Sequence, residues 1–127
     1  MTTKFINKGG ILDSRDLIGA RVENPKGENL GKIESVRLDM DEGRILYAVL
    51  SFGGFLGVGD KLFPVPVEAL MFKTNENGRV TKVVFEADKE RLKNAPGFDK
   101  DSLPNRSDRS FDANVYTYYG YSPYWDE

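Results

Sequence analysis

The segment from Arg44 to Phe52 constrains the fold more than any other, because it is apolar on both faces of a predicted strand. Strand side chains alternate between two faces. The residues expected on one face are Ile45, Tyr47 and Val49, and those expected on the other are Leu46, Ala48, Leu50 and Phe52. Such a strand must be central in its sheet and covered from both sides.

Several shorter strand patterns surround this segment, over 21–23, 30–40, 62–66, from 72 and over 80–85. Ile33 is out of step with the alternation that follows it, which predicts a bulge near Glu34-Ser35. Asn77-Gly78 predicts a hairpin with a two-residue type I′ turn. The helical patterns are short: single turns near 14–19, where Ser14 is the expected cap, and over 67–70. One short helix is expected after the last strand, over 89–94, capped by Asp88 and ended by Pro96. About six short strands without a long helix predict a mainly β fold, a small barrel or sandwich.

The chain divides by composition into three expected parts. Residues 1–12 are interpreted as an N-terminal arm, 13–95 as the β-barrel domain, and 96–127 as a linker followed by an aromatic C-terminal extension. Residues 96–127 carry 3 basic and 6 acidic side chains, a balance of -3, against +1 for residues 1–95. Seven of the 15 aromatic residues fall in 111–127, which is unusual for a disordered tail.

Composition excludes several classes of function. The 127 residues include no Cys and no His, which removes thiol nucleophiles, thiolate metal sites and imidazole acid–base chemistry. We therefore expect no enzyme, no cofactor and no metal site. The net charge of -2 argues against nucleic acid as a partner. The chain has no apolar run of membrane-spanning length and no signal-peptide pattern, so a cytoplasmic protein is expected.

The glycine-rich run GGFLGVGDKLFPVP, residues 53–66, is the most conspicuous motif. It fails as a phosphate loop because Asp60 separates the last glycine from Lys61 and a strand, not a helix, follows. A wide hairpin that closes the barrel end is the favoured interpretation, and a partner-binding tip is the alternative. The residues of that tip would be Gly53, Gly54, Phe55, Leu56, Gly57, Asp60 and Lys61. Pro64 and Pro66 predict that one side of this strand is an edge or leaves the sheet.

The aromatic extension offers a second candidate contact surface, formed by Tyr118, Tyr119, Tyr121, Tyr124 and Trp125. Base stacking and membrane anchoring would both favour basic neighbours, whereas this segment is acidic. Packing is therefore expected, either on its own barrel or on a second copy. Another acidic group, at Asp39, Asp41 and Glu42, does not fit the calcium loop of an EF-hand and is interpreted as a solvated turn.

These pieces together resemble the PRC-barrel family over about residues 11–87. The residues that carry the resemblance are Leu17-Ile18-Gly19, Val22, Gly27, Leu30-Gly31-Lys32-Ile33, Asp39, Gly43, Ile45 and the FGGFLGVGDKLFPVP run. The resemblance implies a small, strongly bent β-barrel. The family takes its name from the photosynthetic reaction centre H subunit, and it includes a domain of a ribosome-maturation factor. In both proteins the barrel serves as a protein-contact module and not as an enzyme. The NAPGFD segment and the tyrosine-rich end resemble stand-alone members.

The expected function is accordingly a non-catalytic scaffold that forms a homodimer and binds another, unidentified protein. Two alternatives stay open. One is a small-ligand or nucleotide-binding regulator that uses the loop over 53–61. The other is an RNA-processing or ribosome-associated accessory factor, which conflicts with the negative charge. A membrane contact is expected only through a membrane-protein partner.

Overall fold

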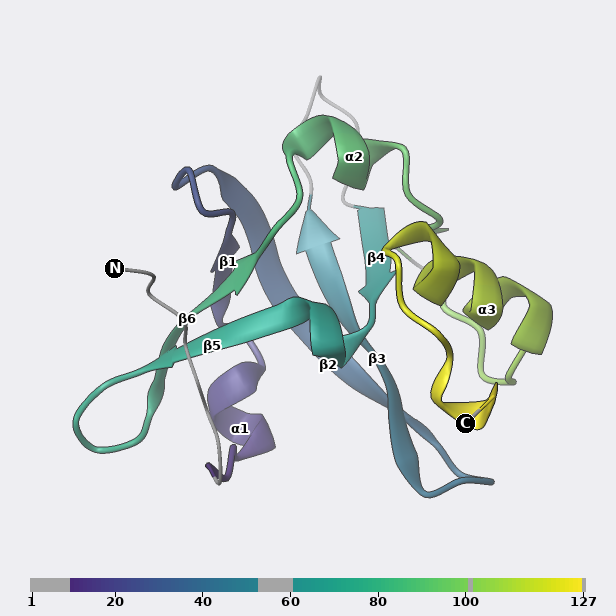
Figure 1. Ribbon diagram of the computed structural model, residues 1–127, viewed down its shortest axis with the longest axis horizontal. Coiled ribbons are helices and arrows are strands. Elements are labelled where there is room, and N and C mark those ends of the chain that lie inside the picture. The colour runs from purple at the N-terminus through teal and green to yellow at the C-terminus, as the bar shows by residue number, and fades with distance from the viewer. Residues whose placement is uncertain (1–9, 53–60, 101, 127) are drawn as a thin grey trace.

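The computed structural model describes residues 10–52, 61–100 and 102–126, which form a bent sheet with short helices around it (Figure 1). The strands are β1 (Arg21–Glu23), β2 (Asn29–Asp39), β3 (Arg44–Phe52), β4 (Lys61–Val65), β5 (Leu70–Thr74), β6 (Val80–Phe85) and β7 (Phe98–Asp99). The helices are α1 (Ser14–Leu17), α2 (Lys89–Lys93) and α3 (Arg109–Tyr118), and the 3₁₀ turns are η2 (Val67–Ala69) and η3 (Tyr124–Asp126).

The described strands form one mixed sheet in the order β5-β6-β1-β2-β3-β4-β7. Neighbours are antiparallel except β1 and β6, which run parallel. Within the described residues the two edge strands are not hydrogen-bonded to each other, and the sheet curls so that β5 runs across the direction of β3 (Figure 1). The predicted mainly β, strongly bent fold is confirmed. The strand that the sequence did not predict is β7, which lies in the stretch interpreted as a linker.

The bulge predicted near Glu34-Ser35 is confirmed. In the pairing of β2 with β3, Ile33 lies opposite Leu50 and Ser35 lies opposite Val49, so Glu34 is the extra residue. The bulge explains why Ile33 is buried although it is out of step with the residues that follow.

A second bulge, on β3, was not predicted and corrects the expected alternation. Arg37 lies opposite Tyr47 and Leu38 opposite Ile45, which leaves Leu46 as the extra residue. Leu46 therefore joins Tyr47 in one buried cluster, and Ile45 points outward beside Leu38. Both residues leave the faces that strict alternation assigned to them.

Two hydrophobic clusters cover β3 from opposite sides, as its sequence predicts. The inner cluster lies within the curl of the sheet, and β3 contributes Ala48, Leu50 and Phe52 to it. The outer cluster lies on the other face and contains Tyr47 and Val49, both almost fully buried. Burial on both faces makes β3 the centre of the fold.

The outer cluster is covered by the C-terminal segment, in which α3 lies beside β4 (Figure 1). Asp108 caps α3, since its side chain accepts a hydrogen bond of 3.1 Å from the N–H of Phe111. Tyr116 enters the outer cluster and donates a hydrogen bond of 2.6 Å to the carbonyl of Leu46. Val115 and Tyr119 enter the inner cluster, so one helix contributes to both.

Two local predictions are wrong in detail. Asp13, not Ser14, caps α1, because its carboxylate accepts the N–H of Arg15 at 3.0 Å. The hairpin between β5 and β6 exists, but its turn runs from Asn75 to Gly78. The N–H of Gly78 donates to the carbonyl of Asn75 at 2.9 Å, which is not the two-residue type I′ pattern.

The edge predicted from the two prolines is confirmed. The outer side of β4 pairs with β7 only at Lys61 and Leu62, so Pro64 lies beyond that pairing. After Val65 the chain leaves the sheet through Pro66 into η2. A missing N–H at these positions therefore costs the sheet little.

Candidate functional site

Most of the predicted loop tip lies outside the described residues, namely Gly53, Gly54, Phe55, Leu56, Gly57 and Asp60. Lys61 is described and begins β4 opposite Phe52. Its ammonium lies 3.4 Å from the carboxylate of Asp99, with both side chains largely exposed. Lys61 is therefore held in a solvent-screened ion pair at the corner where the loop joins the sheet.

The predicted aromatic surface divides into buried and accessible residues. Tyr119 and Tyr124 are buried in the chain itself, where Tyr119 packs edge-on against Phe85. The Tyr118 hydroxyl donates a hydrogen bond of 2.5 Å to the backbone carbonyl of Arg91. Tyr121 is partly exposed. The segment thus packs on its own barrel, and its buried rings serve that packing.

The partly buried ring of Trp125 completes this docking. The Arg109 guanidinium lies 4.2 Å from the centroid of the Trp125 ring, and the Trp125 and Tyr124 rings meet edge to face. A cation over an indole face is attracted by the ring quadrupole. Arg109 therefore links the start of α3 to the last aromatic residues of the chain.

A buried carboxylate at the β2–β3 turn anchors the segment. The Asp39 side chain accepts hydrogen bonds from the Tyr124 hydroxyl at 2.5 Å and from the Arg109 guanidinium at 2.6 Å. It also accepts hydrogen bonds from the backbone N–H groups of Asp41, at 3.0 Å, and Glu42, at 3.3 Å. The turn is thus an anchor for distant residues rather than the solvated turn that was expected.

These contacts shift the pKa of Asp39. The hydrogen bond from Tyr124, and then that from Arg109, lower its pKa to about 2 although burial opposes the change. Burial and the same hydrogen bond raise the pKa of Tyr124. Asp39 is therefore charged, and Tyr124 neutral, throughout the physiological range.

Replacement of the Asp39 carboxylate is expected to weaken the anchor in a pH-dependent way. The folded-state pKa lies below the unfolded value of about 3.9, so the stabilisation is complete above about pH 4 and disappears as the pH falls towards 2. Asp39→Asn should lower the free energy of unfolding by about 1–2 kcal/mol at neutral pH, after allowance for solvent screening. Urea unfolding at several pH values measures this, and the difference should shrink in acid. Asp41→Asn, in the same turn but exposed, is the control; an equal loss there would contradict the assignment.

Opposite this anchor, the same hairpin presents an apolar surface, which we call the hairpin patch: Leu38, Met40 and Ile45. Their exposed fractions are 69%, 93% and 43%. Leu38 and Ile45 are paired across the strands, so they share one face. Ile11, Leu12 and Ile18 are also exposed, and they flank α1, which lies at the same lower end of the molecule as the hairpin in Figure 1.

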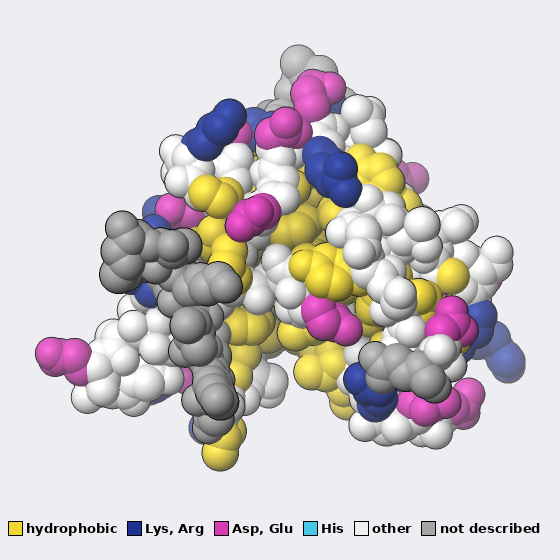
Figure 2. All heavy atoms as spheres, viewed as in Figure 1, with side chains coloured by type: hydrophobic (Ala, Val, Ile, Leu, Met, Phe, Trp, Pro, Cys, Tyr) yellow, Lys and Arg dark blue, Asp and Glu magenta, His cyan; other side chains and the backbone are white. Residues whose placement is uncertain are grey.

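Hydrophobic side chains also line a hollow between the part of the molecule that contains β5 and the part that contains α3, as Figure 2 shows. Figure 2 places this hollow on the face that carries β5 in front and α3 to the right. The molecule therefore exposes an apolar hairpin and, in the middle of the face shown in Figure 2, an apolar hollow. Neither was identified from the sequence, in which Val36, Leu38 and Met40 alternate as one apolar face of the strand.

The described residues include no cluster of three or more Asp or Glu side chains placed to hold a metal ion.

Among the helices that the structure describes, none has the length and apolar character needed to cross a membrane.

A comparison with protein-family models matches residues 10–92 of the chain to the PRC-barrel domain. The match ends within α2, so α3 and the aromatic residues that cover the outer cluster lie beyond it. A comparison with curated proteins finds no match.

Proposed function

The chain belongs to the PRC-barrel domain family, and we propose that it serves as a non-catalytic protein-interaction module that associates with a second copy of itself. The observation that carries the proposal is the hairpin patch. Large apolar side chains that are more than two-thirds exposed, as Leu38 and Met40 are, favour a contact with another protein surface.

The patch is well suited to present a fixed surface. On the other side of the hairpin, Asp39 is held by Arg109 and Tyr124. The anchor therefore restrains the strands that carry Leu38 and Ile45, and a restrained surface loses less conformational freedom when it binds.

A second copy is the partner that we propose for the hairpin patch. Two-fold symmetric dimers are the commonest assemblies, and each patch residue would then contribute twice. Three side chains cover much less than the ~800 Å² per partner of a stable interface. The dimer should consequently be weak and dependent on concentration.

A charged substitution in the patch tests this proposal. Leu38→Lys should weaken dimerisation at least about tenfold, since two-fold symmetry brings two buried ammonium groups together. Sedimentation equilibrium measures the effect, with unchanged melting as the control for folding. Tyr121→Lys, at another exposed apolar position, should leave dimerisation unchanged. A wild-type protein that stays monomeric at high micromolar concentration would refute the dimer.

The two alternative functions gain no support from the part of the chain that the structure describes. Lys61, the proposed ligand-binding cation of the loop, is paired with Asp99. For RNA, the rings of Tyr119 and Tyr124 are unsuitable for base stacking because they are buried. We therefore propose the protein-interaction module rather than either alternative.

A further inference from the structure

Two cations lie directly opposite each other on the outer surface of the sheet. Arg21 of β1 is paired with Lys32 of β2 in the antiparallel register, so their side chains project from the same face, and both are accessible to solvent. Like charges in this position destabilise a strand pair. Within the described residues, neither side chain has an ion pair, whereas Glu23, the nearby carboxylate of β1, is 2.9 Å from Lys82.

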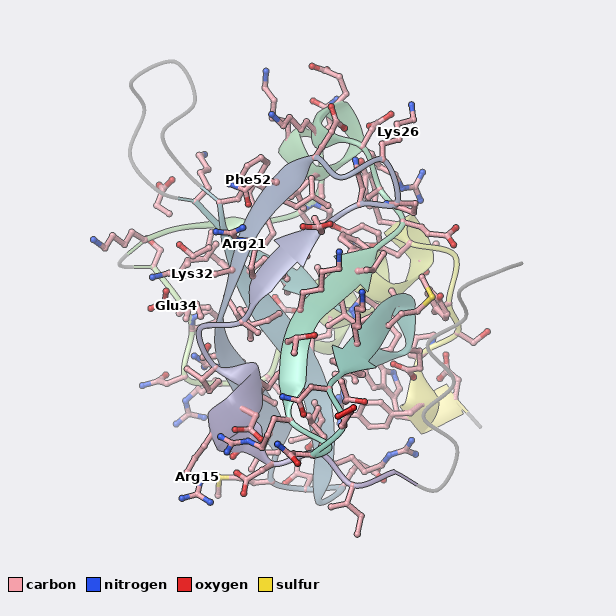
Figure 3. The ribbon with its side chains drawn as sticks, turned by 90° about the vertical axis from the view of Figure 1, so that its left-hand side faces the viewer. Arg15, Arg21, Lys26, Lys32, Glu34 and Phe52 are labelled. Atoms are coloured by element: carbon pink, nitrogen blue, oxygen red, sulfur yellow. The ribbon has the colours of Figure 1, made fainter. Side chains whose placement is uncertain are left out.

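The register shows which part of the molecule this pair occupies. Lys32 lies opposite Ser51, and Ser51 lies opposite Leu62, so these residues form one row across the sheet. Leu62 belongs to the outer cluster beneath the C-terminal segment. In this row the face is thus covered over β4 and open over β1 and the start of β2. Figure 3 shows Arg21, Lys32 and Glu34 together on one side of the molecule, below Phe52.

We propose that Arg21 and Lys32 form a docking site for an acidic, extended segment of a partner protein. In an extended strand, side chains at i and i+2 project to the same side, about 7 Å apart. Two carboxylates at this spacing could each meet one cation, and would relieve the repulsion between Arg21 and Lys32. This site is separate from the hairpin patch and does not depend on dimerisation.

The charges favour a protein segment over nucleic acid at this site. Glu34 stands beside the two cations, so the surface neutralises few phosphates (Figure 3). The nearest labelled aromatic residue, Phe52, is buried and offers no stacking platform. Two cations can neutralise both charges of a pair of carboxylates, but only a small part of the charge of a continuous phosphate backbone.

Backbone-amide NMR of the full chain at low salt tests the proposal, with a peptide carrying Asp-Gly-Asp as the probe. We expect shifts that centre on 21–23 and 31–33, and no such shifts with the Asn-Gly-Asn peptide. Arg21→Glu should weaken binding at least about fivefold, because it reverses one contact. The melting temperature should not fall, because the introduced carboxylate would lie opposite the ammonium of Lys32. Glu34→Gln should tighten binding, whereas Lys73→Glu, an exposed cation on β5, should leave it unchanged.

Three outcomes would overturn the site. One is equal binding of the Asn-Gly-Asn peptide, and another is an unchanged affinity in Arg21→Glu. The third is stronger shifts at the same residues with oligouridine or inorganic phosphate, which would assign the cations to phosphate. The Leu38→Lys variant should bind the peptide normally, so failure here and failure of the dimer proposal are distinguishable.

Discussion

Removal of residues 96–127 is expected to unfold the remaining chain or to leave it aggregated. The deletion uncovers the outer face of β3 and β4, where Tyr47, Val49 and Leu62 have exposed fractions of 2%, 0% and 4%. It also removes Val115 and Tyr119 from the inner cluster. The truncated chain would still contain the whole family match, residues 10–92. We therefore expect the folding of the matched domain to depend on a segment outside the match.

The expected size of this effect follows from the apolar burial. Exposure of one large apolar side chain costs about 1.5–3 kcal/mol, so the three sheet residues alone account for roughly 5–9 kcal/mol. The whole free energy of unfolding of a domain is usually about 5–15 kcal/mol. The loss is thus comparable with the total stability of the protein.

Thermal unfolding followed by circular dichroism measures the outcome. A shorter deletion of 122–127 is the matched control, since it keeps α3 and most of the outer cluster. It removes Tyr124 and Trp125, with their contacts to Asp39, Arg109, Arg44 and Tyr116. It should give a folded protein of intermediate stability. If the 1–95 chain melted within a few degrees of the full chain, the C-terminal segment would not be part of the core.

The sequence predicts that a layer must cover the outer face of β3, but it did not lead us to expect that this layer contains the helix α3. The two apolar faces of residues 44–52 require a layer on each side. The spacing of Phe111, Val115 and Tyr119 is helical, and Asp108 is a suitable cap, so α3 was also visible in principle. The high content of aromatic residues predicted only that this extension packs on the barrel or on a second copy, and no helix was assigned to it.

The anchor at Asp39 lay beyond the reach of sequence patterns. Its partners, Arg109 and Tyr124, are 70 and 85 residues away along the chain. No local spacing connects them, because the contact depends on how α3 and η3 return to the β2–β3 turn. The bulge at Leu46 is similar, since it depends on the register with Arg37 and Leu38. Bulges that leave a break in the alternation, such as that at Glu34, are predictable.

Gly31→Ala is expected to be the most disruptive single substitution, with a loss of more than about 3 kcal/mol. Gly31 has a φ of +99°, a conformation that side chains rarely adopt. A Cβ atom at this position would lie 2.1 Å from the carbonyl oxygen of Ser51 and 3.2 Å from the Cα of Phe52. Both neighbours are backbone atoms of β3, so a side-chain rotation cannot relieve the overlap. Strands β2 and β3 must separate where Lys32 pairs with Ser51.

Gly27→Ala separates the two causes of this loss. Gly27 also has a positive φ, +86°, but an added Cβ would meet no atom within 4 Å. It should therefore cost only the backbone strain, about 1–2 kcal/mol. Urea unfolding of both variants gives the comparison, and the excess loss in Gly31→Ala measures the close approach of β2 to β3. Equal losses would mean that the bend tolerates a side chain at Gly31, and that the curl of the sheet does not depend on this contact.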